Sequence, residues 1–155
     1  TTYVGGDWYV APTVRDTGAV YRNDRMRYET VTREECLRGE KDPCSWEPKA
    51  SAYKWYAEQD GDETVLYVNL HGLDPRRERM EINVRRNVFM PDRNGVDYIT
   101  VSGFVMSKAA TTWAPPAAYQ DGLIGPHWSK GWIIEDCEIY NSKCCGISLG
   151  KYRDP

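Results

Sequence analysis

Apolar and polar residues alternate most clearly between residues 53 and 85. The runs 53–56 and 64–70 both alternate, and the turn-forming residues Asp60-Gly61-Asp62 lie between them. Successive side chains of a strand point to opposite faces, so a period of two indicates half-buried strands, and an Asp-Gly pair between two such runs is typical of a hairpin. Residues 80–85 alternate once more. We therefore predict an antiparallel β layer over residues 50–85.

The first 48 residues carry a weaker pattern. Short β-like pieces at 7–10 and 26–32 are separated by Gly, Pro, Asp and Asn. Thr32 is followed three residues later by Glu35, which is the spacing of a capping box. This predicts a short helix over residues 32–39.

The segment after Pro91 repeats itself. Residues 98–108 align with residues 132–142 at a spacing of 34, each with a short apolar strand, a polar or Gly corner and a second apolar strand. The runs from Gly122 and from Gly146 give a second alignment at a spacing of 24. Stacked coils of this length are typical of β-helices, in which each strand lies on its counterpart in the next coil.

The predicted fold class is therefore all-β. We expect a β-sandwich-like antiparallel region with an irregular N-terminal part over residues 1–90, and the first coils of a right-handed parallel β-helix over residues 91–155. The spacing of 34 exceeds one coil because it includes a loop, the proline-rich segment 111–120. Two coils are too few to bury their own apolar faces, so we expect further coils from the rest of the protein, from another chain or from a homo-oligomer.

Composition narrows the function classes. The net charge of −3 argues against a nucleic-acid partner, and no apolar run approaches the roughly 20 residues that a membrane span needs. The chain has 6 Trp and 11 Tyr but only 2 Phe, and aromatic rings with a polar tip suit surfaces that stack on sugars.

The cysteines do not predict a metal site, and we expect no cofactor. The spacing of the five cysteines does not fit a zinc site. Cys36 and Cys44 are close enough in sequence to form a disulfide, which is left open. The odd number of cysteines and the lack of a signal-peptide pattern in residues 1–7 slightly favour a cytoplasmic protein.

One block of the C-terminal region carries a family resemblance. Residues 128–135 read Trp-Ser-Lys-Gly-Trp-Ile-Ile-Glu, and together with the repeats around them they resemble the β-helix core of the glycoside hydrolase family 120 β-xylosidases. The resemblance covers about residues 52–152. Its matching segments are 66–75, 81–85, 98–104, 109–116, 122–135 and 142–151.

The resemblance implies an enzyme that hydrolyses short xylo-oligosaccharides with retention of the anomeric configuration. It implies two catalytic carboxylates in a groove along the β-helix. Such a pair lies about 5 to 5.5 Å apart, a separation that outward positions on successive coils provide, since they are about 4.8 Å apart. Asp121 and Asp154 are the catalytic candidates beside the groove. In this interpretation Trp113 and Trp128 line the sugar subsite, and His127 or Lys130 bonds its hydroxyl groups.

Simpler interpretations stand beside each assignment. Asp121 and Asp154 could instead be solvated aspartates in turns. Trp128 and Trp132 could instead be packing residues that cap the coil. The family pattern leads us to expect an acidic residue where Tyr119 stands. His71 is more simply a turn residue than a ligand, and Trp132 is more simply a packing residue.

A non-catalytic carbohydrate-binding or structural β-helix domain is the main alternative. Alternation places Ile147 and Leu149 inward and Ser148 outward, where a hydrolase of this type needs a carboxylate. Glu135 and Asp136 fit a solvated face on another side of the coil. A polysaccharide lyase is less favoured, because the coils lack the clustered carboxylates of a Ca²⁺ site.

Overall fold

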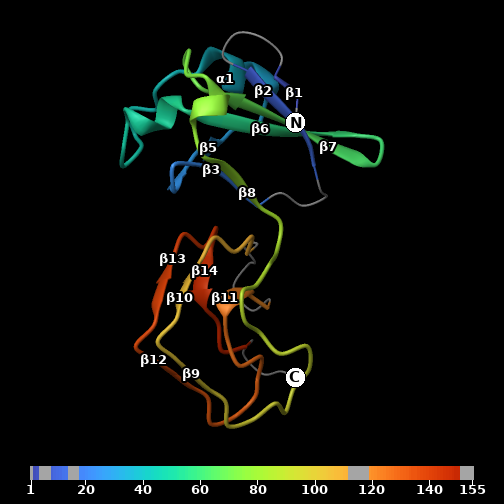
Figure 1. Ribbon diagram of the computed structural model, residues 1–155, viewed down its shortest axis with the longest axis vertical. Coiled ribbons are helices and arrows are strands. Elements are labelled where there is room, and N and C mark those ends of the chain that lie inside the picture. Colours follow the sequence, from blue (N-terminus) through green and yellow to red (C-terminus); the bar gives the residue numbers. More distant parts are fainter. Residues whose placement is uncertain (1, 4–7, 14–17, 112–118, 151–155) are drawn as a thin grey trace. The chain divides into compact units, whose positions relative to one another are not determined.

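The computed structural model describes residues 2–3, 8–13, 18–111 and 119–150. The chain divides into two compact units, Thr1–Ile82 and Asn83–Pro155, which are described in turn. Both are built from strands, with one short α-helix and two 3₁₀ turns in the first (Figure 1). The chain is therefore all-β, while the placement of a domain boundary after residue 90 stays a prediction.

The first unit contains two sheets. The larger has the strand order β1-β2-β7-β6-β5 and the smaller has the order β4-β3-β8. The elements are β1 (Thr2–Tyr3), β2 (Trp8–Thr13), β3 (Ala19–Arg22), β4 (Arg25–Met26), β5 (Tyr28–Glu29), α1 (Arg33–Arg38), η1 (Ala50–Ala52), β6 (Lys54–Asp60), β7 (Glu63–Asn69), η2 (Pro75–Arg77) and β8 (Met80–Asn83).

The predicted hairpin is present and lies in the larger sheet. Strands β6 and β7 pair antiparallel from Trp55 opposite Val68 to Asp60 opposite Glu63. The third alternating segment behaves differently, because β8 joins β3 in the smaller sheet rather than continuing the layer. The single antiparallel layer predicted for residues 50–85 is thus divided between two sheets.

Both sheets contribute to one hydrophobic core. Trp55, Leu66 and Val68 of the larger sheet and Val20 of the smaller sheet are each about 1% exposed, and Leu70 is fully buried. Fully burying a side chain such as Leu contributes about 1.5–3 kcal/mol. The Trp55 indole Nε1 donates to the carbonyl of Arg27 at 3.2 Å, so this large side chain is also satisfied as a donor.

The capping box produces the predicted helix. Thr32 is the N-cap of α1, and its hydroxyl accepts a hydrogen bond from the backbone N–H of Glu35 at 3.2 Å. The helix ends at Gly39, which adopts a left-handed conformation with φ 57°. A Cβ there would lie 2.4 Å from Asn69 Nδ2, a group that donates to the helix carbonyl of Cys36. Glycine therefore suits the conformation at position 39, and a Cβ there would displace the Asn69 side chain.

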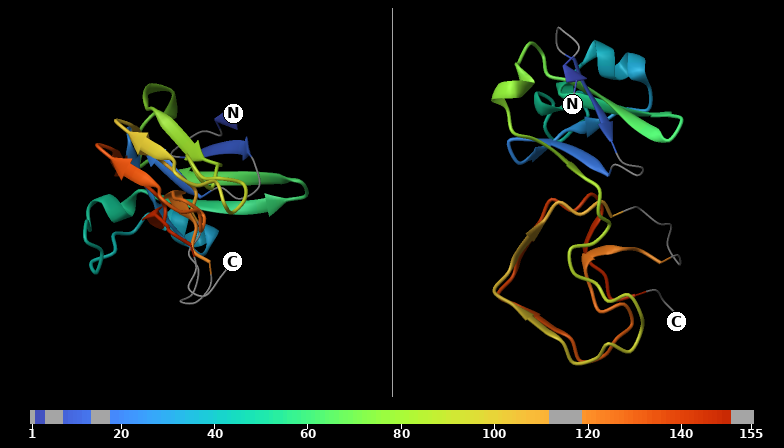
Figure 2. Two further views of the ribbon diagram at one scale, coloured as in Figure 1. Left: turned by 90° about the horizontal axis from the view of Figure 1, so that it is seen from below. Right: turned by 45° about the vertical axis from the view of Figure 1, so that its right-hand side comes forward.

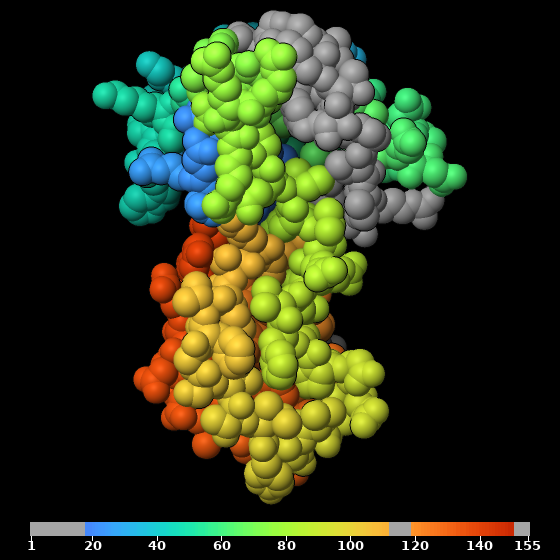
Figure 3. Space-filling view, in the orientation of Figure 1, coloured from blue at the N-terminus to red at the C-terminus, as the bar shows by residue number. Residues whose placement is uncertain are grey.

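The second unit consists of two turns of chain that run side by side (Figure 2). Its strands pair parallel in three two-stranded sheets, β9 with β12, β10 with β13 and β11 with β14. Their bounds are β9 (Thr100–Ser102), β10 (Val105–Ser107), β11 (Gly122–Ile124), β12 (Ile133–Glu135), β13 (Glu138–Tyr140) and β14 (Cys145–Ile147). In the space-filling view the orange-yellow and red-orange residues of this unit form adjacent layers (Figure 3).

The repeated segments do pair with each other, but their predicted register is wrong by one residue. Thr100 lies opposite Ile133, an offset of 33 rather than 34, and Gly122 lies opposite Cys145, an offset of 23 rather than 24. The alignment of Tyr98 with Trp132 caused the first error. Tyr98 is 80% exposed and outside the strand, whereas Trp132 packs against the core beside Ile99.

The difference between the two offsets, 33 minus 23, is ten residues. This equals the length of the segment 111–120 that the sequence assigns to a loop. Only the longer spacing crosses that segment, so a single insertion accounts for both offsets.

The predicted facing of the last strand, which rests on alternation, is also wrong. Ser148 is 7% exposed, whereas Ile147 is 46% and Leu149 is 71% exposed. The outward assignment of Ser148 and the inward assignments of Ile147 and Leu149 are therefore wrong.

Candidate functional site

The site is built on β11 and the turn that follows it. Gly122, Leu123 and Ile124 are all buried, and the chain then turns at Pro126-His127-Trp128-Ser129, closed by a hydrogen bond from the Ser129 N–H to the Pro126 carbonyl at 3.0 Å. His127 and Trp128 both have positive φ, 48° and 61°. Turns with two such central residues usually place Gly, Asn or Asp there.

Two adjacent aromatic residues in this conformation are unusual. Left-handed backbone costs about 1–3 kcal/mol for such residues and persists where the surroundings fix it. Here the Trp128 N–H donates to the carbonyl of Leu149 on the next turn of chain, at 3.2 Å. Gly150 completes the fit, because a Cβ at that position would lie 2.8 Å from the Trp128 indole Nε1. Strained backbone of this kind is often found at functional sites.

Tyr119 joins these two side chains to form an aromatic cluster. Its ring stacks on Trp128 with centroids 4.9 Å apart and an interplanar angle of 27°. His127 meets Tyr119 and Trp128 edge-on, at 5.5 and 4.8 Å. All three side chains are partly exposed, so the cluster presents a ring surface to solvent. Such surfaces suit contact with the apolar face of a sugar.

Hydrogen bonds and charge fix the Tyr119 phenol. Its hydroxyl donates to Met90 Sδ at 3.2 Å and lies 3.2 Å from His127 Nδ1. Burial raises the pKa of Tyr119 to about 12, and the negative charge of Asp121 and a hydrogen bond with that carboxylate add to the shift. The phenol therefore stays protonated near neutral pH, and its single proton can go to either Met90 Sδ or the Asp121 carboxylate at one time.

The structure brings together three of the six predicted site residues. Asp121, His127 and Trp128 all contact or approach Tyr119. Trp113 and Asp154 lie outside the described residues. Lys130 is exposed and its backbone N–H is held by Asp97 Oδ1 at 2.7 Å. These contacts do not test the catalytic or binding roles, which stay predictions.

The structural interpretations of three other residues are confirmed. Trp132 packs against the core of the second unit and donates from Nε1 to the Val96 carbonyl at 2.7 Å. His71 is a turn residue with φ 48°, and its Nε2 contacts the Ala52 carbonyl at 2.9 Å. Glu135 is exposed, as a solvated face requires.

Tyr119 is the member of the cluster that the sequence did not assign to the site. The family pattern predicts an acidic residue at this position. Its spacing of two residues from Asp121 was the available signal, since both side chains of an extended segment at that spacing point to the same side.

Other kinds of site find little support within the described part of the chain. No group of three or more His, Cys, Asp and Glu side chains could hold a metal ion there. Cys36 and Cys44 are both free thiols, the first buried and the second exposed. Among the described helices, none is long and apolar enough to cross a membrane.

Comparison with known proteins identifies the family. Residues 1–82 match the family model for the glycoside hydrolase 120 insertion domain. A solved structure described as the complex structure of XylC with xylose is 38% identical, with a TM-score of 0.80. That alignment covers 94% of this chain and 28% of the XylC chain. No curated protein matches the chain.

The family match coincides with the first compact unit, Thr1–Ile82. It includes the first 51 residues, where the sequence pattern is weakest and which lie outside the resemblance over residues 52–152. The structural alignment extends the likeness over nearly all of the chain. The chain belongs to glycoside hydrolase family 120.

Proposed function

We propose that this chain is part of a glycoside hydrolase that acts on short xylo-oligosaccharides, and that the aromatic cluster borders its sugar site. The observation that carries the proposal is the grouping of Tyr119, Asp121, His127 and Trp128 on one edge of the second unit. The similar structure was solved as a complex with xylose, which makes a pentose the first ligand to test.

The second unit supplies the scaffold in this proposal. Parallel pairing of three successive strand pairs, at offsets explained by one insertion, supports the first coils of a right-handed parallel β-helix. The chain spans about a quarter of the related XylC chain. In the proposed whole protein, further coils extend the groove.

Asp121 has the proposed role of one carboxylate in a retaining mechanism. In that mechanism one carboxylate attacks the anomeric carbon while the other protonates the leaving oxygen and later activates water. The protonated Tyr119 phenol beside Asp121 orients the carboxylate, and the stacked rings hold the sugar. Asp154 or a residue from further coils supplies the second carboxylate.

The test measures hydrolysis of an aryl β-xyloside by the whole protein and its variants. Asp121→Asn should lower kcat at least about 100-fold, the scale of a lost acid–base or nucleophilic group. Glu135→Gln is the matched control, because this exposed carboxylate lies on another strand. Trp128→Ala should raise KM about 10-fold, since one aromatic contact contributes up to about 1.5 kcal/mol, and Trp128→Phe should raise it less.

Two results would count against the proposal. If Asp121→Asn keeps its activity within about two-fold, Asp121 is not catalytic. If the whole protein turns over no aryl glycoside, the hydrolase assignment fails and a non-catalytic carbohydrate-binding domain remains. That alternative still requires weaker xylose binding by Trp128→Ala. Its original support, an outward Ser148, disappears with the burial of that side chain.

A further inference from the structure

A hollow in the first unit is lined by an unusual number of positive charges. Its volume is about 440 Å³, and its lining includes Arg22, Arg25, Arg27 and Lys49 together with Tyr53. Pockets of roughly 300 Å³ and above accommodate small organic ligands. Arg22 and Arg25 lie on the β3–β4 hairpin and Arg27 directly follows it, so all three arginines fall within six residues.

Arg27 is held rigidly at this hollow. The residue is 6% exposed, and its Nε donates to the Arg25 carbonyl at 3.0 Å. Its backbone N–H donates to the Val20 carbonyl at 2.8 Å, and its own carbonyl accepts from the buried Trp55 indole. The guanidinium is therefore positioned by the core of the unit rather than by a flexible loop.

Arg22 carries unsatisfied donors. Its side chain is 21% exposed, and its Nε and Nη1 atoms are buried without a hydrogen-bond partner among the described residues. The nearest carboxylate oxygen, Glu78 Oε2, lies 3.5 Å from Nε, which makes an ion pair but not a hydrogen bond. A buried charged donor without a hydrogen bond is unfavourable, so an added counter-charge beside this guanidinium is favoured.

Tyr53 brings the two arginines together. The Arg22 guanidinium carbon lies 4.9 Å from the ring centroid, and that of Arg27 lies 5.6 Å from it. Cation–π contacts stabilise each guanidinium but leave its N–H groups free to donate in the plane of the group. Both forks are thus kept near one ring at the wall of the hollow.

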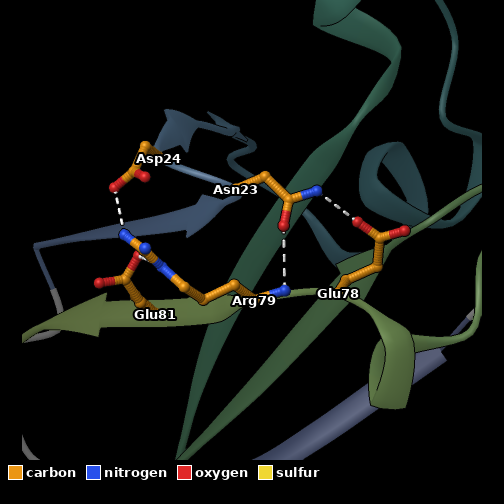
Figure 4. A network of polar contacts seen from close by, with 5 residues as sticks. All are labelled: Asn23, Asp24, Glu78, Arg79 and Glu81. Carbon is orange, nitrogen blue, oxygen red and sulfur yellow. Dashed lines mark hydrogen bonds and ion pairs between the residues drawn. The ribbon is translucent and has the colours of Figure 1, made fainter.

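The carboxylates near the hairpin are engaged with other partners (Figure 4). Glu78 Oε2 accepts from the Asn23 amide at 2.6 Å. Arg79 binds Asp24 and also Glu81, the latter at 2.9 Å, and its backbone N–H donates to Asn23 Oδ1. Of these three carboxylates, Glu78 also pairs with Arg22 of the hollow at 3.5 Å, whereas Asp24 and Glu81 pair with Arg79.

The positive charges of the hollow repel one another. The pKa of Arg27 is lowered, first by burial and then by the charges of Arg22 and Arg25, with smaller opposing effects from Tyr53 and Glu47. Like charges gathered in a partly buried place are unfavourable unless a counter-charge joins them. The lowered pKa supports what the geometry already indicates.

From this geometry we infer that the hollow is a binding site for an oxyanion, a carboxylate or phosphate group on a ligand of about monosaccharide size. Guanidinium forks pair with such groups through two parallel hydrogen bonds. The site lies in the first unit, uses none of the residues of the aromatic cluster, and does not depend on the proposed hydrolysis.

The experiment is calorimetric titration of the full chain at low salt with three probes. Inorganic phosphate and glucuronate carry the two oxyanions, and xylose is the neutral control. Arg22→Gln should weaken binding of the oxyanion about 10-fold, which corresponds to one charge-assisted hydrogen bond. Lys49→Gln and Arg25→Gln, at exposed positions, should weaken it less and keep the fold. Arg38→Gln, an exposed arginine on α1, removes the same charge elsewhere and should leave binding unchanged.

The probes separate the two ligand sources. Binding of glucuronate alone indicates an acidic sugar, binding of phosphate alone indicates a phosphorylated ligand, and binding of both indicates a general oxyanion site. The inference is overturned if neither anion binds at millimolar concentration, or if Arg38→Gln weakens binding as much as the hollow variants do. Xylose binding that depends on Trp128 bears only on the proposed sugar site.

Discussion

Replacing Gly125 by alanine tests how the candidate site depends on the contact between successive turns of chain. Gly125 directly follows β11, and a Cβ there would lie 1.8 Å from the Ser148 carbonyl oxygen and 2.9 Å from its carbonyl carbon. Both are backbone atoms, so no side chain can move aside. Gly125 is not among the positive-φ glycines, and the expected effect is therefore steric.

The magnitude follows from the hydrogen bonds that must lengthen. Ser148 donates to the Ile124 carbonyl at 3.1 Å, Trp128 donates to the Leu149 carbonyl at 3.2 Å, and Gly125 donates to the Phe89 carbonyl at 3.3 Å. A net contribution of about 1 kcal/mol each gives a loss of about 2–3 kcal/mol in the free energy of unfolding of this unit. The same shift displaces the His127-Trp128 turn, so xylose binding should weaken as well.

Gly146→Ala is the matched control in the same pair of strands. Its added Cβ would meet Ile139 Cγ2 at 3.5 Å, an ordinary van der Waals contact. This substitution should be neutral or stabilise by about 0.4–1 kcal/mol, because alanine restricts the unfolded chain. Urea unfolding gives the free energies, and amide hydrogen exchange over residues 122–128 and 145–149 locates the change. Equal effects of the two substitutions, or a cost below about 1 kcal/mol for Gly125→Ala, would refute the reasoning.

Two further predictions concern the first unit. Thr32→Ala should cost about 1 kcal/mol of stability by removing the N-cap bond to the Glu35 N–H, whereas Thr32→Ser should retain most of it in the same urea titration; equal losses would mean that the cap contributes little. Burial raises the pKa of the Cys36 thiol from 9.0 to about 11. In the unfolded chain this thiol ionises at lower pH than in the folded chain, so the stability it contributes is fully present below about pH 9 and is lost as the pH rises toward 11. Urea titrations at pH 8 and 10.5 should show a larger decrease for the wild type than for Cys36→Ala, and iodoacetamide at pH 8 should label the exposed Cys44 but not Cys36. Rapid labelling of Cys36 in the folded protein would contradict the burial that this prediction uses.

The sequence by itself determined the local elements and the existence of the repeat. Thr32 and Glu35 are three residues apart and specify a helix start through contacts within one turn, so their prediction needed no knowledge of the fold. The hairpin of β6 and β7 follows from alternation and an Asp-Gly turn for the same reason. Parallel stacking of residues near 100 and 133 was visible because each coil repeats the same apolar pattern.

Only the tertiary structure decided the register and the side chains that meet. A repeated apolar pattern is satisfied almost equally by offsets of 33 and 34, and the choice depends on Trp132 packing inward beside Ile99 while Tyr98 stays outside. That choice of register accompanies the burial of Ser148. The stacking of Tyr119 on Trp128 depends on the path of the chain between them, and the meeting of Arg22 and Arg27 with Tyr53 depends on how two sheets share a core. Contacts between residues far apart in the chain are set by packing, which local periodicity does not encode.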